Sequence, residues 1–382
     1  MKGFRLGLSS SSWPERVCCC CEMKNRWKTL MKSTPRNGIT RALLAALLFG
    51  ASTPLAKLAI SAADPVLVAG LLYLGSGVGL VVMRAILSTS GVGPKETPVS
   101  RKDLPWLAGA ILAGGVAGPV LLLLGLMTTP ASSASLLLNL EAVATATIAW
   151  IVFRENVDRR IFFGFILILL GGILLSLPHG ERFAISPGAI LIAGACLCWG
   201  IDNNLTRKIS GSDPFQIAMW KGLIAGIVNT CIALGIGAKI PATSVVFGAL
   251  VIGFFGYGLS LVLFVRALRD LGTARTGAYF SIAPFAGVAL SFAIGQGQLD
   301  WAFGVAGLLM LAGVWLHISE RHEHLHVHEA LEHEHLHIHD EHHQHEHSPD
   351  DQSGEPHAHR HRHARLVHTH PHYPDTHHRH EH

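Results

Sequence analysis

Residues 49–57 read FGASTPLAK and residues 199–207 read WGIDNNLTR, and these two stretches decide the fold. In register they share an aromatic residue followed by Gly, then a Leu, then a cation. Each stretch lies inside a run of mostly apolar residues that is long enough to span a bilayer. The chain therefore contains an internal repeat, and the repeated unit is a set of apolar helices.

Three further matches follow in the same order along the chain. Asp64-Pro65 corresponds to Asp213-Pro214, and residues 140–143 (LEAV) correspond to residues 282–285 (IAPF). Between these two matches in the chain, Gly109, Ala110 and Gly114 correspond to Gly248, Ala249 and Gly253. One match of this kind is weak, but four in one order indicate a duplicated chain.

The composition is that of a membrane protein. Apolar residues make up 49% of the 382 residues and Asp, Glu, Lys and Arg only 15%, against about a quarter in soluble domains. Ten mostly apolar stretches are predicted to be helical spans, at 41–61, 65–84, 105–127, 131–152, 161–177, 187–206, 214–236, 245–266, 275–295 and 301–318. A soluble protein could not cover so many nearly uncharged helices with polar groups. The predicted fold class is therefore an all-α integral membrane protein.

Five spans per repeat is an odd number, so the two halves must enter the membrane in opposite orientations. The loop charges agree, because the loop after span 2 is rich in Lys and Arg whereas its counterpart after span 7 holds only Lys239. We predict two inverted five-helix repeats, at 40–178 and 187–318. Secondary transporters with this architecture bind substrate near the membrane midplane, between the repeats.

Lys and Arg also predict the orientation. They crowd the segment before span 1 and the loops after the even-numbered spans, whereas the loops after the odd-numbered spans hold only Arg182 and Lys239. Because cytoplasmic loops carry the excess of Lys and Arg, we expect a multi-pass protein of the cell (inner) membrane with both termini in the cytoplasm.

The segment 1–39 is polar and lacks the apolar core of a cleaved signal peptide. It carries four adjacent cysteines, Cys18 to Cys21, which suit S-acylation beside a membrane better than one tetrahedral metal site. The alternative is a chain that starts later, at Met23 or Met31.

One more pattern carries a resemblance to a known family. Residues 135–141 (SLLLNLE) run on to residues 150–155 (WIVFRE), and Ala283-Pro284 stands in the matching span of the second half. Together with the aromatic-Gly pairs at 49 and 199, the chain resembles the EamA-type transporters of the drug/metabolite transporter superfamily over residues 40–318. The resemblance implies ten helices in two inverted repeats and gradient-coupled movement of a small molecule, often outward, without fixing one substrate.

The chain departs from this family pattern at two positions. Ala142 stands where Pro is common, so the resemblance leaves the kink of span 4 open. Gly297 stands in the second half where the first has Glu155, so Glu155 is expected to serve one half only.

Ionisable groups inside spans are costly to bury, so each is a candidate for transport. Glu141 lies ten residues into span 4, where desolvation favours the neutral carboxyl and suits a proton carrier. The alternatives are a permanent ion pair, for example with Lys57, or a hydrogen bond between helices. Lys221 in span 7 is expected to pair with Asp202 or to contact an anionic substrate.

Polar turns at matching positions of spans 1 and 6 are candidates for the walls of a cavity. Pro54 has no N–H and leaves the carbonyl one turn earlier without its donor, which is tolerated only against protein or water. Hydrogen bonding between helices is the alternative. The full set of substrate or coupling candidates is Glu141, Asn139, Ser52, Thr53, Trp199, Asp202, Asn203, Asn204, Lys221, Tyr257 and Tyr279.

Residues 319–382 form a second, different body. Of the 25 His in the chain, 23 lie between Arg321 and His382, among 12 Asp and Glu. Too few apolar residues are present to form a core, so we predict a disordered cytoplasmic tail. Imidazole binds Zn, Ni, Cu and Co ions, and carboxylates add harder ligands. The candidate metal ligands are His322, His324, His326, His328, His333, His335, His337, His339, His342, His343, His345 and His347.

The predicted function is export of a small organic metabolite or drug by alternating access, coupled to protons through Glu141. The alternatives are a divalent transition-metal (Ni, Co or Zn) exporter served by the tail, or a membrane-anchored metal-binding or sensing protein. No Walker-type loop and no nucleophile–base pattern occurs, so neither ATP-driven pumping nor an enzyme is predicted. No cofactor is expected to be required, and a divalent transition metal at the tail is left open.

The expected partners are a small-molecule substrate, the lipid bilayer and Ni, Zn, Co or Cu ions. Homodimerisation is left open, and no nucleic acid is expected.

Overall fold

The computed structural model describes residues 35–89, 97–153, 159–176, 186–271 and 273–318, and four strands of the tail at 323–328, 332–337, 357–362 and 366–371. The chain divides into two units after Ile318. Cys18 to Cys21, Glu155 and some predicted metal ligands lie outside the described residues, namely His322, His339, His342, His343, His345 and His347.

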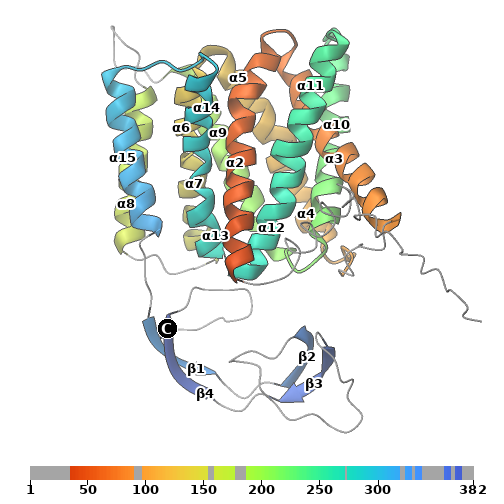
Figure 1. Cartoon of the computed structure of the whole chain (residues 1–382), viewed down its shortest axis with the longest axis vertical. Coiled ribbons are helices and arrows are strands. Elements are labelled where there is room, and N and C mark those ends of the chain that lie inside the picture. Colours follow the sequence, from red (N-terminus) through yellow and green to blue (C-terminus); the bar gives the residue numbers. More distant parts are fainter. Residues whose placement is uncertain are drawn as a thin grey trace, which may run out of the picture. The chain divides into compact units, whose positions relative to one another are not determined.

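The helical unit has two halves of matching element order (Figure 1). The first half contains α2 (Pro35–Ile60), α3 (Pro65–Thr89), α4 (Leu104–Ala110), η1 (Ile111–Ala117), α5 (Gly118–Thr128), α6 (Ala131–Leu137), α7 (Leu140–Phe153) and α8 (Arg159–Ser176). The second contains α9 (Pro187–Lys208), α10 (Pro214–Gly235), α11 (Thr243–Gly253), η2 (Phe254–Leu259), α12 (Ser260–Leu271), α13 (Thr273–Phe280), α14 (Ala283–Ala293) and α15 (Trp301–Ile318).

Among the described residues, seven helical stretches are long and apolar enough to cross a membrane: 37–60, 65–88, 104–128, 131–152, 187–208, 214–235 and 243–271. Three shorter apolar helices cover Phe162–Ser176, Ala283–Ala293 and Trp301–Leu316. Each segment overlaps one of the predicted spans. The all-α membrane fold is confirmed, and the number of ten crossings stays a prediction.

The Asp-Pro pairs of the repeat begin equivalent helices. Asp64 accepts hydrogen bonds from the N–H groups of Val66 at 2.9 Å and Leu67 at 3.1 Å, at the start of α3. Asp213 accepts one from Phe215 N–H at 2.9 Å, at the start of α10. An Asp cap followed by Pro favours a helix start. The carboxylate accepts hydrogen bonds from the free N–H groups of the first turn, and Pro has no N–H that would need a partner there.

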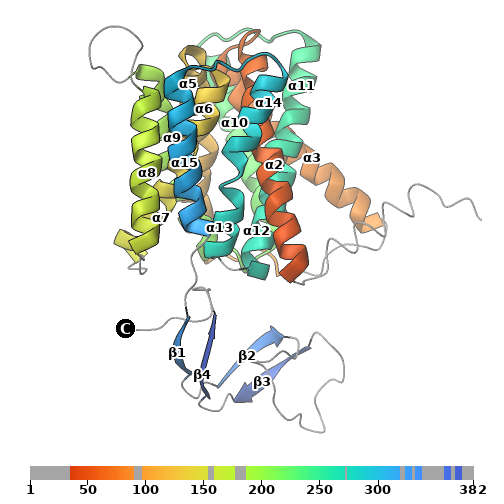
Figure 2. The same cartoon turned by 60° about the vertical axis from the view of Figure 1, so that its left-hand side comes forward.

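The two halves pack against each other through the repeated glycines. Gly50 of α2 lies so close to α14 that a methyl group there would overlap the Ala283 carbonyl, and Gly200 of α9 abuts Ala144 of α7 in the same way. The first helix of each half thus contacts the fourth span of the other, and α2 and α14 lie side by side in Figures 1 and 2. This exchange is the packing that an inverted repeat requires.

A second exchanged contact corrects one of the sequence matches. Gly114 in the π-helical turn η1 abuts Asp202, and Gly256 in the π-helical turn η2 abuts Ser52. The counterpart of Gly114 is therefore Gly256 and not Gly253. Several glycines stand close together in this part of the second half, so the sequence alone did not fix the register.

Spans 4 and 9 are both broken helices. α6 ends at Leu137 and α7 begins at Leu140, while α13 ends at Phe280 and α14 begins at Ala283. The second break precedes Pro284, which cannot continue a helical hydrogen-bond ladder. At the first break Asn139 acts instead: its side-chain amide donates to the Leu136 carbonyl at 2.9 Å, and its backbone N–H donates to the same oxygen at 3.0 Å. The kink that the family pattern left open is present.

The structure describes four short strands in the tail, and the disorder of the tail as a whole stays a prediction. β1 (Glu323–His328) pairs antiparallel with β4 (Leu366–Pro371), and β2 (Glu332–His337) pairs antiparallel with β3 (His357–Arg362). The alternation of His with other residues has a period of two, which is that of an extended strand.

Candidate functional site

Glu141 lies in the first turn of the half-helix α7, directly after the break of span 4. Its Oε1 accepts a hydrogen bond from Asn203 Nδ2 of α9 at 2.9 Å, and Asn203 Nδ2 also donates to Thr145 Oγ1 at 3.2 Å. Glu141, Thr145 and Asn203 are all half-buried. The structure thus joins one carboxyl, one hydroxyl and one amide from the two halves of the chain into one hydrogen-bonded group.

Asn204 holds the same two helices together. Its Nδ2 donates to the Thr145 carbonyl at 2.9 Å and to the Gly200 carbonyl at 2.8 Å. Asn204 is buried, whereas Asn203 is half-buried, so Asn204 serves to hold α9 against α7. For Asn204, the alternative of hydrogen bonding between helices is what the structure shows.

Asp202 and Lys221 form a buried ion pair. Lys221 Nζ lies 2.7 and 2.6 Å from the two carboxylate oxygens of Asp202, and Thr206 Oγ1 donates to Asp202 Oδ1 at 2.9 Å. Lys221 is 3% exposed and Asp202 5% exposed. Lys221 contacts both oxygens of the carboxylate, so the ion-pair interpretation of Lys221 is the one observed.

Aromatic rings from both halves of the chain form one cluster. Phe49 of α2 meets Trp199 at 5.7 Å, Tyr257 at 5.9 Å and Phe280 at 5.5 Å between ring centroids. Tyr73 lies 5.3 Å from Tyr257. Such edge and tilted contacts add to the apolar burial of the rings.

The carbonyl of Gly114 accepts two of the polar groups of this aromatic cluster. Tyr73 Oη donates to it at 2.6 Å and Trp199 Nε1 at 3.0 Å. A π-helical turn such as η1 leaves carbonyls outside the regular ladder, and here one of them anchors side chains from α3 and α9. Trp199 is therefore fixed as well as buried.

The remaining candidates from the sequence do not all join this group. Ser52 donates to the Phe49 carbonyl at 2.6 Å, and Thr53 is buried with no hydrogen-bond partner for its hydroxyl among the described residues. Asn139 is buried and supports the helix break. Tyr279 packs against Ala42 and Ala267 in a separate apolar cluster, so the structure does not bring it to the aromatic cluster.

Lys57, the suggested ionic partner of Glu141, lies elsewhere. Its ammonium donates to the carbonyl of Leu126 and, at 3.1 Å, to the carbonyl of Thr129. These carbonyls close the C-terminal end of α5, where a cation is favourable. The described residues give the Glu141 carboxylate an amide partner and no ion pair.

We call the end of the bundle where α2 begins and α9 ends the basic end. Most cations of the described residues lie there: Arg41, Arg84, Arg101, Lys102, Arg159, Arg160, Arg207, Lys208, Arg266 and Arg269. Lys57 and Lys239 lie at the opposite end.

Ion pairs tie the helices together at the basic end. Arg41 of α2 pairs with Asp270 of α12, and Arg84 of α3 pairs with Asp213 at 2.7 Å. Arg269 donates to the carbonyls of residues 210 to 212, between α9 and α10.

Asp103 at the same end links two loops. It accepts hydrogen bonds from Ser100 N–H and from Ser212 Oγ, each at 2.9 Å. Desolvation raises the pKa of Asp103, but these hydrogen bonds outweigh it and hold the pKa below its ordinary value. The carboxylate is therefore charged at neutral pH and contributes to closure of this end.

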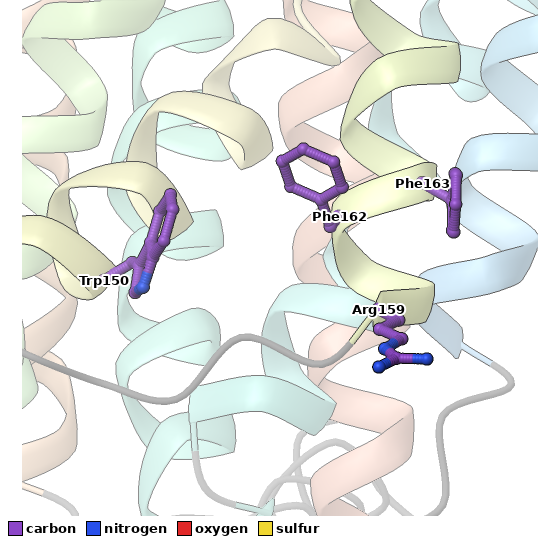
Figure 3. A pocket seen from close by; sticks show the side chains of 4 residues that line it. All are labelled: Trp150, Arg159, Phe162 and Phe163. Carbon is purple, nitrogen blue, oxygen red and sulfur yellow. The ribbon is translucent and has the colours of Figure 1, made fainter.

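A pocket of about 410 Å³ opens on the surface at the basic end, between the end of α7 and the start of α8. Figure 3 shows its lining: Trp150 on α7, and Arg159, Phe162 and Phe163 on α8. These aromatic side chains are largely exposed, as expected at a membrane–water interface. None of the Glu141, Asp202 or aromatic-cluster residues lines this pocket.

Tyr73 and Thr145 were missed by sequence reasoning. Thr145 stands four residues after Glu141, which places both on one helix face, so that spacing was a usable signal. Tyr73 lies in a mostly apolar span and carries no such signal. In the part of the chain whose side chains are described, no three His, Cys, Asp or Glu gather as a metal site.

Comparison with known proteins agrees with this architecture. An uncharacterised transporter of Methanothermobacter thermautotrophicus is 29% identical over 294 residues, which make up 73% of this chain and 85% of that protein. A probable amino-acid metabolite efflux pump of Salmonella typhimurium is 26% identical over 208 residues, 50% of this chain and 68% of the pump.

A solved crystal structure shares the fold, with a TM-score of 0.57 at 17% identity over 72% of this chain and 95% of the solved one. The model of the EamA-like transporter family matches residues 36–177 and 186–319, which covers both halves of the helical unit. The chain therefore belongs to the EamA-like transporter family and is a multi-pass membrane transporter of small molecules.

Proposed function

We propose that this transporter exports a small organic metabolite by alternating access and that Glu141 carries the coupling proton. The observation that carries the proposal is the position of Glu141: it is a half-buried carboxyl at the start of a half-helix, with an amide as its partner. Broken helices near the midplane are where secondary transporters bind substrates and coupling ions.

The amide partner suits a group that gains and loses a proton. An N–H donor bonds a carboxylate oxygen and the carbonyl oxygen of a protonated carboxyl alike, so Asn203 can hold Glu141 in both states. Asp202 has a different arrangement, because the ammonium of Lys221 lies 2.7 and 2.6 Å from its two carboxylate oxygens. Of the two carboxyls on these neighbouring helices, only Glu141 is arranged for exchange.

Alternating access requires one end of the bundle to open while the other closes. The contacts of Arg41 with Asp270 and of Arg269 with residues 210–212 join α12 to α2 and to the α9–α10 connection. These contacts would have to break for opening at the basic end. Because cations mark the cytoplasmic side, we place the basic end and both termini of the helical unit in the cytoplasm.

The names of the relatives suggest which substrate class to test first. The Salmonella protein is called a probable amino-acid metabolite efflux pump, so amino acids are the first metabolites to test. The rival substrate is a divalent transition metal, and the same cells can report on both.

The experiment uses bacterial cells that produce the intact chain, Glu141→Gln or the control Asp64→Asn at equal levels. Asp64→Asn also changes a carboxylate to an amide, but at a helix cap that Asn satisfies. The cells are fed dipeptides, amino acids released into the medium are separated by chromatography, and cellular Ni, Co and Zn are measured by elemental analysis.

We expect the intact chain and Asp64→Asn to raise the release of at least one amino acid, and Glu141→Gln to fall to the level of empty cells. A fall in one cellular metal that depends on Glu141, without amino-acid release, would support the metal exporter instead. Equal release by Glu141→Gln and the intact chain would contradict the role of Glu141.

A further inference from the structure

The pocket between α7 and α8 lies apart from the group around Glu141, and its lining has a chemistry of its own. Trp150 lies near the end of α7, and Arg159, Phe162 and Phe163 lie in the first turns of α8 (Figure 3). The rings of Phe162 and Phe163 stand edge to face, with centroids 6.2 Å apart. Three aromatic rings and one guanidinium thus border a space of about 410 Å³.

The packing of α8 explains why a pocket forms at this place. α8 packs mainly along α15, and its contact with α7 is much smaller. Deeper in the bundle, α7 and α8 share an apolar cluster that contains Val143, Phe165 and Ile168. Trp150 lies about two turns beyond Val143 along α7, and Phe162 lies one turn before Phe165 on α8. The shared cluster therefore lies on the inner side of the pocket, and the two helices separate toward the basic end.

The exposure of the rings indicates what they contact. Trp150, Phe162 and Phe163 are 47%, 48% and 58% exposed, at the ends of two apolar helices of a membrane protein. Aromatic residues at the ends of membrane spans lie at the level of the lipid headgroups, and apolar rings favour contact with hydrocarbon over water. A pocket lined in this way suits a lipid better than a water-soluble metabolite.

Arg159 gives the pocket its charge. It is an exposed residue at the start of α8, at the basic end, and the described residues that line the pocket include no Asp or Glu. A guanidinium matches the oxygens of a phosphate group in a two-pronged contact. Basic pockets between membrane helices are suited to the headgroups of anionic lipids. The charge of the lining therefore complements a phosphate, and its rings complement the carbon chain attached to it.

From this lining we propose that the α7–α8 pocket binds one anionic phospholipid of the leaflet at the basic end. Arg159 holds the phosphate, and Trp150, Phe162 and Phe163 contact the glycerol and the first carbons of one acyl chain. A whole phospholipid is larger than the pocket, so the rest of its chains stays in the bilayer. The bound lipid joins α7 to α8 where the two helices have little contact of their own. The site does not depend on which substrate the helical unit transports.

The test uses the purified full chain, stripped of native lipid in a neutral detergent. Binding of the first phosphatidylglycerol is measured by native mass spectrometry and compared with binding of phosphatidylcholine. Arg159→Gln is matched with Arg160→Gln, which removes the same charge from the same turn of α8 at a residue that is not among the described lining residues. Trp150→Leu is matched with Trp315→Leu, a tryptophan that is 66% exposed on α15.

The intact chain is expected to bind the first phosphatidylglycerol more tightly than phosphatidylcholine. Arg159→Gln should weaken this binding by about tenfold or more, the effect of losing a hydrogen bond to a charged group, and Trp150→Leu by several-fold. Arg160→Gln and Trp315→Leu should bind as the intact chain does. Equal losses within each matched pair, or no loss for Arg159→Gln and Trp150→Leu, would overturn the proposal.

A competition experiment separates a lipid from free phosphate as the ligand. Inorganic phosphate is added in excess to the complex of the intact chain with phosphatidylglycerol. The lipid should remain bound, because inorganic phosphate cannot contact the three rings. If inorganic phosphate displaces the lipid, the pocket is a site for soluble phosphate groups and the lipid assignment is wrong.

Discussion

Asp202 and Asn203 are neighbours in the chain, and the fold gives them different partners. Asp202 lies on the side of α9 that faces Lys221, in a buried pair with oxygens at 2.6 and 2.7 Å. Asn203 faces α7 and leaves Glu141 half-buried. Because adjacent residues of a helix point in different directions, Asp202 joins a buried ion pair whereas Asn203 bonds Glu141, the candidate for proton exchange.

The buried ion pair should stabilise the fold rather than carry transport. We expect Asp202→Asn or Lys221→Met to lower the free energy of unfolding by about 3–5 kcal/mol, because each leaves a buried charge without its partner. The double variant should recover most of that loss, as thermal unfolding of the purified protein would show. If the two single effects simply add in the double variant, the pair is not coupled.

At the scale of elements, the two broken spans reach one shape by different means. Pro284 occupies the first turn of α14, whereas α7 relies on the Asn139 side chain bonded to Leu136. The Ala142 N–H, which a Pro would remove, makes one 3.2 Å bond to the Asn139 carbonyl. We therefore expect a Pro to be tolerated at the start of α7 but not in the interior of the helix.

Pro substitutions test where α7 begins. Ala142→Pro should cost about 1 kcal/mol, the value of one hydrogen bond, whereas Ala146→Pro in the same helix should cost about 3 kcal/mol or more. Thermal unfolding of both variants measures the difference. Equal loss of stability would mean that α7 continues unbroken from α6.

At the scale of the whole molecule, the inverted repeat rests on exchanged glycine contacts. A methyl group on Gly50 would meet the Ala283 carbonyl and one on Gly200 would meet Ala144, whereas methyl groups on Gly248 or Gly304 would meet open space. The close approach of helix backbones is what small residues permit in membranes.

Ala substitutions separate these two classes of glycine. Gly50→Ala and Gly200→Ala should lower the thermal midpoint of the purified protein. Gly248→Ala and Gly304→Ala should leave it unchanged or raise it, because Ala favours a helix over Gly by about 1 kcal/mol. A common response of all four would contradict the exchanged packing.

Much of this architecture could be predicted from the sequence, because helical spans and their repeat are written in local pattern. In the structure the apolar runs form helices, the Asp-Pro pairs begin α3 and α10, and the glycines of the aromatic-Gly pairs lie at helix contacts. The hydrogen-bond partners of the polar residues could not be predicted from the sequence, because the side of α9 that faces α7 depends on tertiary packing. Tyr73 was missed for this reason.

The most direct test of the central claim is a comparison of two transport modes in proteoliposomes, with an equimolar mixture of amino acids as the substrate. The intact protein should accumulate at least one amino acid when a pH gradient is imposed, and should also exchange internal for external amino acid without a gradient. For Glu141→Gln the account predicts that exchange persists while the pH gradient no longer drives accumulation. If Glu141→Gln accumulates amino acid in response to the gradient as the intact protein does, Glu141 is not the coupling group.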